Sequence, residues 1–174
     1  MRWKWLGVGW GFAGALVVAM PHVDAAGVSD RLTIRNDSAG PYYTPSTWTW
    51  PAGQTVKLTI VSHDDGASPL KDRSPETRVL GTVHRQEWVD GKPVGRVAGG
   101  RISHTLTIPG LRVNLPIPAA RTGGTVTVVA WVRVSHPGTY AWYCEAPCGT
   151  GARGDGGPMA TPGLMQGVLH VAEN

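Results

Sequence analysis

Two cysteines separated by three residues are the side chains of this sequence best suited to chemistry. Cys144 and Cys148 begin a Gly- and Pro-rich loop, CEAPCGTGARGDGGPMATPG. The segments on either side, TYAWYC and LMQGVLHV, have the aromatic and β-branched composition of strands. Thiolates bind soft metals such as copper, so a close thiol pair between two strands fits a metal site. It equally fits a loop closed by a Cys144–Cys148 disulfide, which requires Cα atoms within about 7 Å.

Three further side chains carry the soft or imidazole donors that would complete a copper site. Met165 begins the strand that follows the loop, and Met159 lies inside the loop. His104 lies in ISHTLTI, which reads as a strand about forty residues upstream of the loop. Thioether, thiolate and imidazole are the ligands that select copper. The sequence therefore offers donors of all three kinds, and Met159 is the weaker candidate of the two methionines.

The other histidines after residue 25 are not taken as ligands. His136 lies eight residues before Cys144, about 26 Å along an extended strand, and His170 lies about 16 Å beyond Met165. His84 falls in a predicted hairpin. His63-Asp64-Asp65 resembles a metal cluster in the sequence, but we interpret it as a solvated turn.

The elements that must position these residues are predicted to be short strands. The sequence is rich in turn formers, with 24 Gly and 14 Pro, and its charged fraction of 16% is too low for a disordered chain. We expect seven or eight strands and a hairpin turning at Asp90-Gly91, which predicts an all-β sandwich or barrel. The predicted strand segments are 31–36, 56–60, 78–95 (the hairpin), 102–108, 125–134, 139–144 and 164–171.

The N-terminus predicts export. Residues 6–20, LGVGWGFAGALVVAM, form an apolar core that follows the basic stretch MRWKW and precedes small residues suited to signal peptidase. This core is shorter than the roughly 20 residues of a membrane span, so we expect a signal peptide, with an uncleaved anchor helix as the alternative. The predicted organisation is a targeting segment, 1–25, and one domain, 26–174. Its location would be periplasmic, extracellular or on the outer face of the cytoplasmic membrane.

Charge and motifs argue against several other functions. The net charge is +4, but Lys and Arg are scattered and form no basic run, so we expect no nucleic-acid partner. No Ser/His/Asp spacing supports a catalytic triad, and the glycines after Cys148 open no helix that would bind phosphate. We identify no catalytic residues.

Three motifs together resemble the cupredoxin superfamily. They are PAGQTV leading into a strand, SHTLTIP, and PGTYAWYC ending at a cysteine. The resemblance is closest to the copper-binding (CuA) domain of cytochrome c oxidase subunit II, whose PGxYxxxCxxxCG run matches residues 137–149. Its closing strand opens with a Met followed two residues later by Gly, as Met165 and Gly167 do here. The resemblance covers roughly residues 52–62 and 101–171 and implies a cupredoxin-like Greek-key β-sandwich.

The resemblance also implies ligands and partners. One or two copper ions would be bound by His104, the two cysteines and Met165, with Ala146 contributing its backbone carbonyl. Such a domain would take electrons from a small redox protein and pass them to other oxidase subunits, as the electron-transfer component of an enzyme at most. Membrane association would come through the N-terminal segment.

The sequence departs from the family at one ligand. The family's second His would stand four residues after the second Cys and three before the Met, where this chain has Ala152 and Pro162. An insertion, GARGDGGPMA, separates these positions. Three alternatives follow: a dinuclear copper site lacking one imidazole, an altered or mononuclear copper site, or a metal-free interaction or assembly module with a Cys144–Cys148 disulfide.

Overall fold

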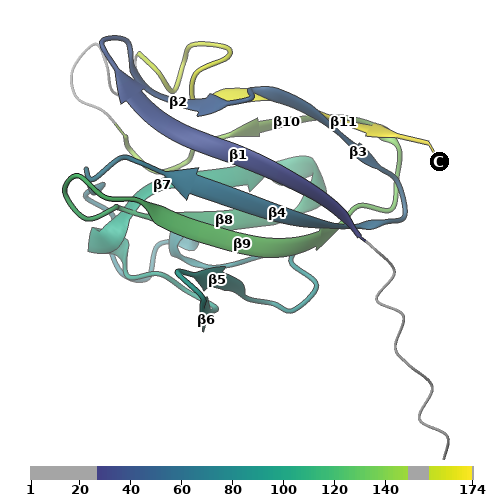
Figure 1. The fold of residues 1–174 in the computed structure, drawn as a ribbon, viewed down its shortest axis with the longest axis horizontal. Helices are drawn as coiled ribbons and strands as arrows, with labels where there is room; N and C mark the ends of the chain where they lie inside the picture. The colour runs from purple at the N-terminus through teal and green to yellow at the C-terminus, as the bar shows by residue number, and fades with distance from the viewer. Residues whose placement is uncertain (1–26, 149–156, 174) are drawn as a thin grey trace, which may run out of the picture.

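Two β-sheets packed face to face make up the described chain (Figure 1). The computed structural model describes residues 27–148 and 157–173; the predicted targeting segment 1–25 and Ala152 lie outside them. The first sheet has the order β2 (Gly40–Thr44), β1 (Val28–Asp37), β4 (Thr55–Ser62), β9 (Val126–Arg133), β5 (Glu87–Val89) and β6 (Lys92–Val94). The second has the order β3 (Thr47–Pro51), β11 (Gln166–Ala172), β10 (Gly138–Tyr143), β7 (Ile102–Ile108) and β8 (Val113–Pro118). The predicted all-β sandwich is confirmed.

The only helices in the described residues are three single 3₁₀ turns. They are η1 (Pro75–Thr77), η2 (Gly99–Arg101) and η3 (Pro109–Leu111). None of the helices in these residues has the length and hydrophobicity that a membrane span requires.

Hydrophobic alternation explains the centre of the first sheet. In β9, buried and half-buried residues alternate along Val126–Arg133, and β4 pairs with it in antiparallel register from Thr55↔Arg133 to Ser62↔Val126. The inward-facing residues of both strands pack into the core between the sheets. A pattern that repeats every two residues therefore places one face of each strand against the other sheet.

The second sheet is covered on both faces where it carries the candidate histidine. Every residue of β7 and β8 is buried. The long segment between β4 and β5 contacts these strands through backbone hydrogen bonds: Ser68 N–H donates to the Ile102 carbonyl, and Leu80 pairs with Asn114. Because both faces of β7 are covered, its residues do not alternate between buried and exposed.

Three strands lie outside the segments predicted from the sequence. They are β2 over residues 40–44, β3 over Thr47–Pro51, and β8 in the Pro-punctuated stretch after Ile108. All three lie at a sheet edge, where a proline that cannot donate a ladder hydrogen bond is tolerated. The predicted hairpin over 78–95 does turn at Asp90-Gly91, but its paired arms are only three residues each.

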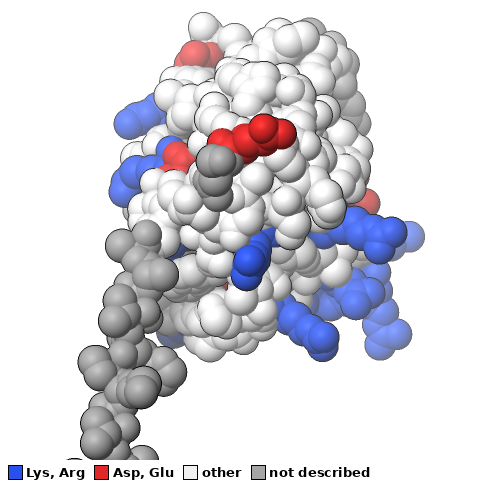
Figure 2. Space-filling model, turned by 90° about the vertical axis from the view of Figure 1, so that its right-hand side faces the viewer, with Lys and Arg blue, Asp and Glu red and all other residues white. Residues whose placement is uncertain are grey.

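Basic side chains are scattered over one end of the sandwich. Figure 2 looks at the end of the sandwich where β11 finishes, and its Lys and Arg side chains form separate groups divided by uncharged surface. The cysteine loop lies at the opposite end, beyond the last residue of β10 (Figure 1).

Candidate metal centre

Adjacent strands bring the histidine and the cysteines together. Cys144 directly follows β10, and β10 pairs with β7, the strand of His104, through Tyr143↔Thr107. The loop is closed at its base because Cys144 N–H donates to the Met165 carbonyl over 2.9 Å. The strand ladder therefore determines which residues meet at this end of the sandwich.

His104, Cys144 and Cys148 form a compact cluster. One ligand atom from each, an imidazole nitrogen or a sulfur, lies within 4.8 Å of the others, and all three residues are buried. The Cys148 thiol donates to Cys144 Sγ over 3.7 Å, a separation well beyond the roughly 2.05 Å of a disulfide bond. Of the four candidate ligands, the fold therefore brings these three together in one cluster.

Cys144 Sγ has two backbone neighbours. Thr105 N–H donates to it over 3.4 Å, and the Ala146 carbonyl oxygen lies 3.4 Å away. Ala146 is fully buried, so its carbonyl is held at the cluster, where the sequence prediction placed a backbone ligand.

Asp64 is the functional residue that sequence reasoning missed. Its Oδ2 lies 2.8 Å from His104 Nε2, so the interpretation of residues 63–65 as a solvated turn was wrong for Asp64. The carboxylate is fixed in place, since Gly66 N–H donates to Oδ1 and Ala120 N–H donates to the Asp64 carbonyl. The sequence signal, an acidic pair just after a buried strand, was visible, but its distance from His104 was not.

This contact leaves one nitrogen of His104 facing no partner. Nε2 is taken by Asp64, and Nδ1 is buried with no hydrogen-bond partner. Buried polar atoms in folded proteins are nearly always hydrogen-bonded, so an orphan next to two sulfurs is an observation that a metal explains. A carboxylate on the far nitrogen is also the usual arrangement around a metal-binding histidine.

Burial and the neighbouring groups move the pKa values of His104 and Cys144 in opposite directions. Burial would lower the pKa of His104, but the hydrogen bond to Asp64 and the Cys144 sulfur outweigh it and raise that pKa to about 9. Burial would likewise raise the pKa of Cys144; the hydrogen bonds from Cys148 and Thr105 and the nearby charge of His104 instead hold it well below the ordinary value. A lowered pKa favours the thiolate, the state in which cysteine binds metals.

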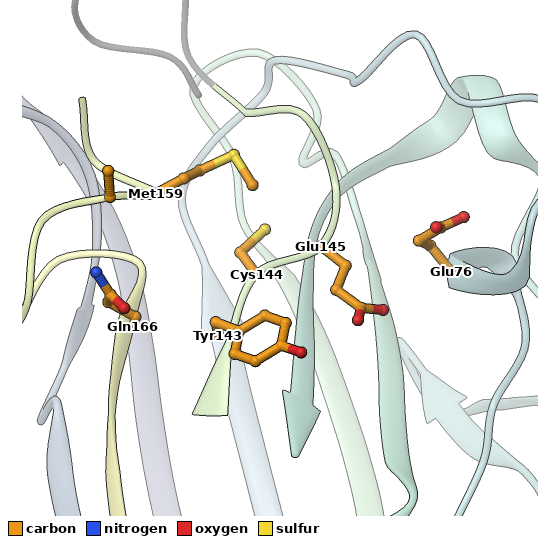
Figure 3. Close-up of a pocket in the computed structure, with 7 residues that line it drawn as sticks. Glu76, Tyr143, Cys144, Glu145, Met159 and Gln166 are labelled. Atoms are coloured by element: carbon orange, nitrogen blue, oxygen red, sulfur yellow. The ribbon is translucent and has the colours of Figure 1, made fainter. Parts of the chain in front are cut away.

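The two methionines differ in burial and in their contacts. Met165 is fully buried, and its backbone is joined to Cys144 N–H and to the Pro158 carbonyl. Met159 is half-buried and shares a pocket with Cys144; in Figure 3 the two side chains point toward one another.

Among the described residues, no histidine other than His104 joins the cluster. His84 packs edge-on against Trp88 and Trp131, with ring centroids 5.5 and 5.6 Å apart. The exposed His170 bonds to Thr139.

A pocket of about 530 Å³ opens beside Cys144 (Figure 3). Burial raises the pKa of Glu145 in this pocket, and the neighbouring charges of Glu76 and Cys144 raise it further. The lining side chains that carry heteroatoms are Glu76, Tyr143, Cys144, Glu145, Met159 and Gln166.

Neither a protein-family model nor a curated protein matches this sequence. Among solved structures, it is similar to a chain of a heme-copper terminal oxidase dimer, with 15% identity over 91% of this chain and 78% of that chain, at a TM-score of 0.43.

It is also similar to auracyanin A, a blue copper protein from Chloroflexus aurantiacus, with 13% identity, 83% and 98% coverage and a TM-score of 0.43. Rusticyanin, a copper protein, gives 17% identity, 84% and 80% coverage and a TM-score of 0.42. These similarities are weak in sequence and in superposition, so the fold assignment rests on the motifs, topology and site. The described residues form a two-sheet β-sandwich with a buried His104–Cys144–Cys148 cluster at one end.

Proposed function

We propose that this chain is an exported copper-binding electron-transfer domain, similar to the copper domain of cytochrome c oxidase subunit II. The observation that carries the proposal is the buried, unpartnered Nδ1 of His104 beside two cysteine sulfurs. His104, Cys144 and Cys148 would hold the metal, with Met165 as a further ligand and the Ala146 carbonyl as a weak one. Bound copper would supply a one-electron couple.

The chain's own residues would hold the site in a form that changes little on electron transfer. Asp64 orients the imidazole, and the Cys144–Met165 backbone bond fixes the loop. Such preorganisation keeps donors in place without rearrangement. A small redox protein would supply electrons, and oxidase subunits or a second carrier would accept them. The predicted export would place this exchange outside the cytoplasm.

Reconstitution with copper tests the proposal. The purified protein is expected to take up one copper ion per chain, because the described residues offer a single imidazole at the cluster. Two ions would indicate a dinuclear site. Strong thiolate-to-copper absorption in the visible region is the expected signature, and the double variant C144S/C148S should lack it. A colourless wild-type protein that holds no copper would refute the proposal.

The second candidate is a metal-free interaction or assembly module. It is favoured by the 3.7 Å separation of the Cys144 and Cys148 sulfurs, which places both thiols close together for oxidation to a disulfide. Mass spectrometry of the unreduced protein separates the two functions: a mass lower by two hydrogens, with no bound metal, supports the module.

A further inference from the structure

The pocket beside Cys144 is lined by one of the three cluster residues. Cys144 contributes to its wall, whereas His104 and Cys148 are not among the described lining residues. Cys144 is 3% exposed, so its sulfur is sheltered but borders the pocket. An ion that arrives through this pocket therefore meets Cys144 before the other two ligands.

A soft donor stands at the same pocket. The Met159 side chain extends over Cys144 in Figure 3, and it comes from the opposite side of the loop. A thioether binds Cu(I) in preference to hard cations, and it carries no proton that must be displaced. Met159 is half-buried, so solvent reaches it more readily than it reaches the fully buried Met165.

The charge of the pocket suits a cation. Glu76 and Glu145 both line it, and no Lys or Arg is among the described lining residues. Glu76 Oε2 is buried without a hydrogen-bond partner, although the rest of that side chain is only half-buried. A concave surface with one sign of charge raises the local concentration of the opposite ion.

We propose that this pocket is the loading site for Cu(I), where Met159 binds the arriving ion and transfers it to Cys144. The inference rests on the proposed copper function and adds the route by which the site is filled. The transfer is a ligand exchange without oxidation or reduction: the Met159 sulfur–copper bond breaks as the Cys144 sulfur–copper bond forms. Any proton still on Cys144 Sγ leaves to water, and Met159 returns to its free thioether.

The rate of copper loading tests this route. The copper-free protein is mixed anaerobically with the coloured Cu(I)–bicinchoninate complex, and the loss of colour reports transfer to the protein. Met159→Leu conserves volume and removes the donor, and we expect loading about tenfold slower, equivalent to a barrier raised by about 1.4 kcal/mol. The copper bound at equilibrium should equal that of the wild type, because Met159 does not hold the ion in the final site.

A second variant isolates the charge. Glu76→Gln/Glu145→Gln should also slow loading and weaken its dependence on salt, because screening acts on the attraction that the carboxylates supply. The control is Glu173→Gln, an exposed position seven residues along the chain from Gln166, about 23 Å by strand rise. It should load at the wild-type rate.

The outcomes separate the two proposals. Wild-type loading rates in Met159→Leu, with full copper binding, would overturn the loading route and leave the proposed function intact. A reduced equilibrium copper content in Met159→Leu would also overturn it, because Met159 would then be a resident ligand. A wild-type protein that takes no copper would refute the proposed function itself.

Discussion

At the residue scale, the candidate site depends on a contact between residues forty positions apart. Asp64 contacts Nε2 of His104, which leaves Nδ1 as the ring nitrogen without a hydrogen-bond partner. Gly66 N–H donates to Asp64 Oδ1, and Ala120 N–H donates to the Asp64 backbone carbonyl. These two hydrogen bonds hold the carboxylate in its orientation toward His104. This arrangement makes Asp64 a positioning residue rather than a ligand.

Replacing Asp64 is expected to weaken copper binding without removing a ligand. Asp64→Ala should lower the affinity about 10- to 100-fold, the usual cost of losing the partner of a metal-binding histidine. Asp64→Asn should recover part of the loss, because its amide oxygen can accept the Nε2 proton. Competition with a copper chelator measures both affinities. Wild-type affinity in Asp64→Ala would show that the contact does not position the imidazole.

At the scale of elements, the site depends on the close packing of β11 against β3 and β10. Gly167 pairs with Trp142 across β10 and β11, and the Trp142 indole N–H donates to the Ser46 carbonyl over 3.0 Å. A Cβ added at Gly167 would lie 1.9 Å from Ser46 O and 2.8 Å from the Trp142 ring. Only glycine fits between these strands, directly after the loop.

Gly167→Ala is therefore expected to destabilise the sandwich. The backbone of Ser46 and the buried Trp142 must shift, and overpacking of this kind costs about 1–3 kcal/mol or more. Urea unfolding of the copper-free protein measures the change. Gly100→Ala is the matched control: its Cβ would meet nothing within 4 Å, so the change should stay within about 0.5 kcal/mol. Equal stability of the two variants would contradict the packing argument.

At the scale of the whole molecule, one buried acid links stability to pH. Glu87 is fully buried, and neither carboxylate oxygen has a hydrogen-bond partner. Burial raises its pKa well above the ordinary value, so the unfolded chain ionises at a lower pH than the folded protein. The contribution of Glu87 to the free energy of unfolding is therefore fully present below its ordinary pKa of about 4.3. It is lost as the pH rises toward the pKa of Glu87 in the folded protein.

Glu87→Gln removes this dependence, because the amide stays neutral at every pH. The variant and the wild type should be similarly stable near pH 4. Above that pH the wild type should lose up to about 1.4 kcal/mol per pH unit relative to the variant, until the folded protein also ionises. Urea unfolding from pH 4 to 8 measures the difference, in which the titration of other groups cancels. A constant difference across this range would show that Glu87 does not ionise on unfolding.

Sequence alone determined the architecture and most of the donor set. The period-two alternation in β4 and β9 identified sandwich strands because burial on one face imposes that period. The thiol pair was recognisable because few residue types bind soft metals, and His104 was singled out by the resemblance to the cupredoxin motifs. The edge strands β2, β3 and β8 were not predicted, because their prolines fit turns and loops as well until the neighbouring strand is known.

Tertiary structure alone decided how the donors are arranged. The segment after β4 folds back over β7, so Asp64 reaches His104 and covers it, and no local pattern encodes that approach. The pocket that joins Met159 to Cys144 likewise exists only after the two sides of the loop meet. The chemistry of a side chain depends on its own residue type, whereas the distance between residues far apart in the sequence depends on how the whole chain packs.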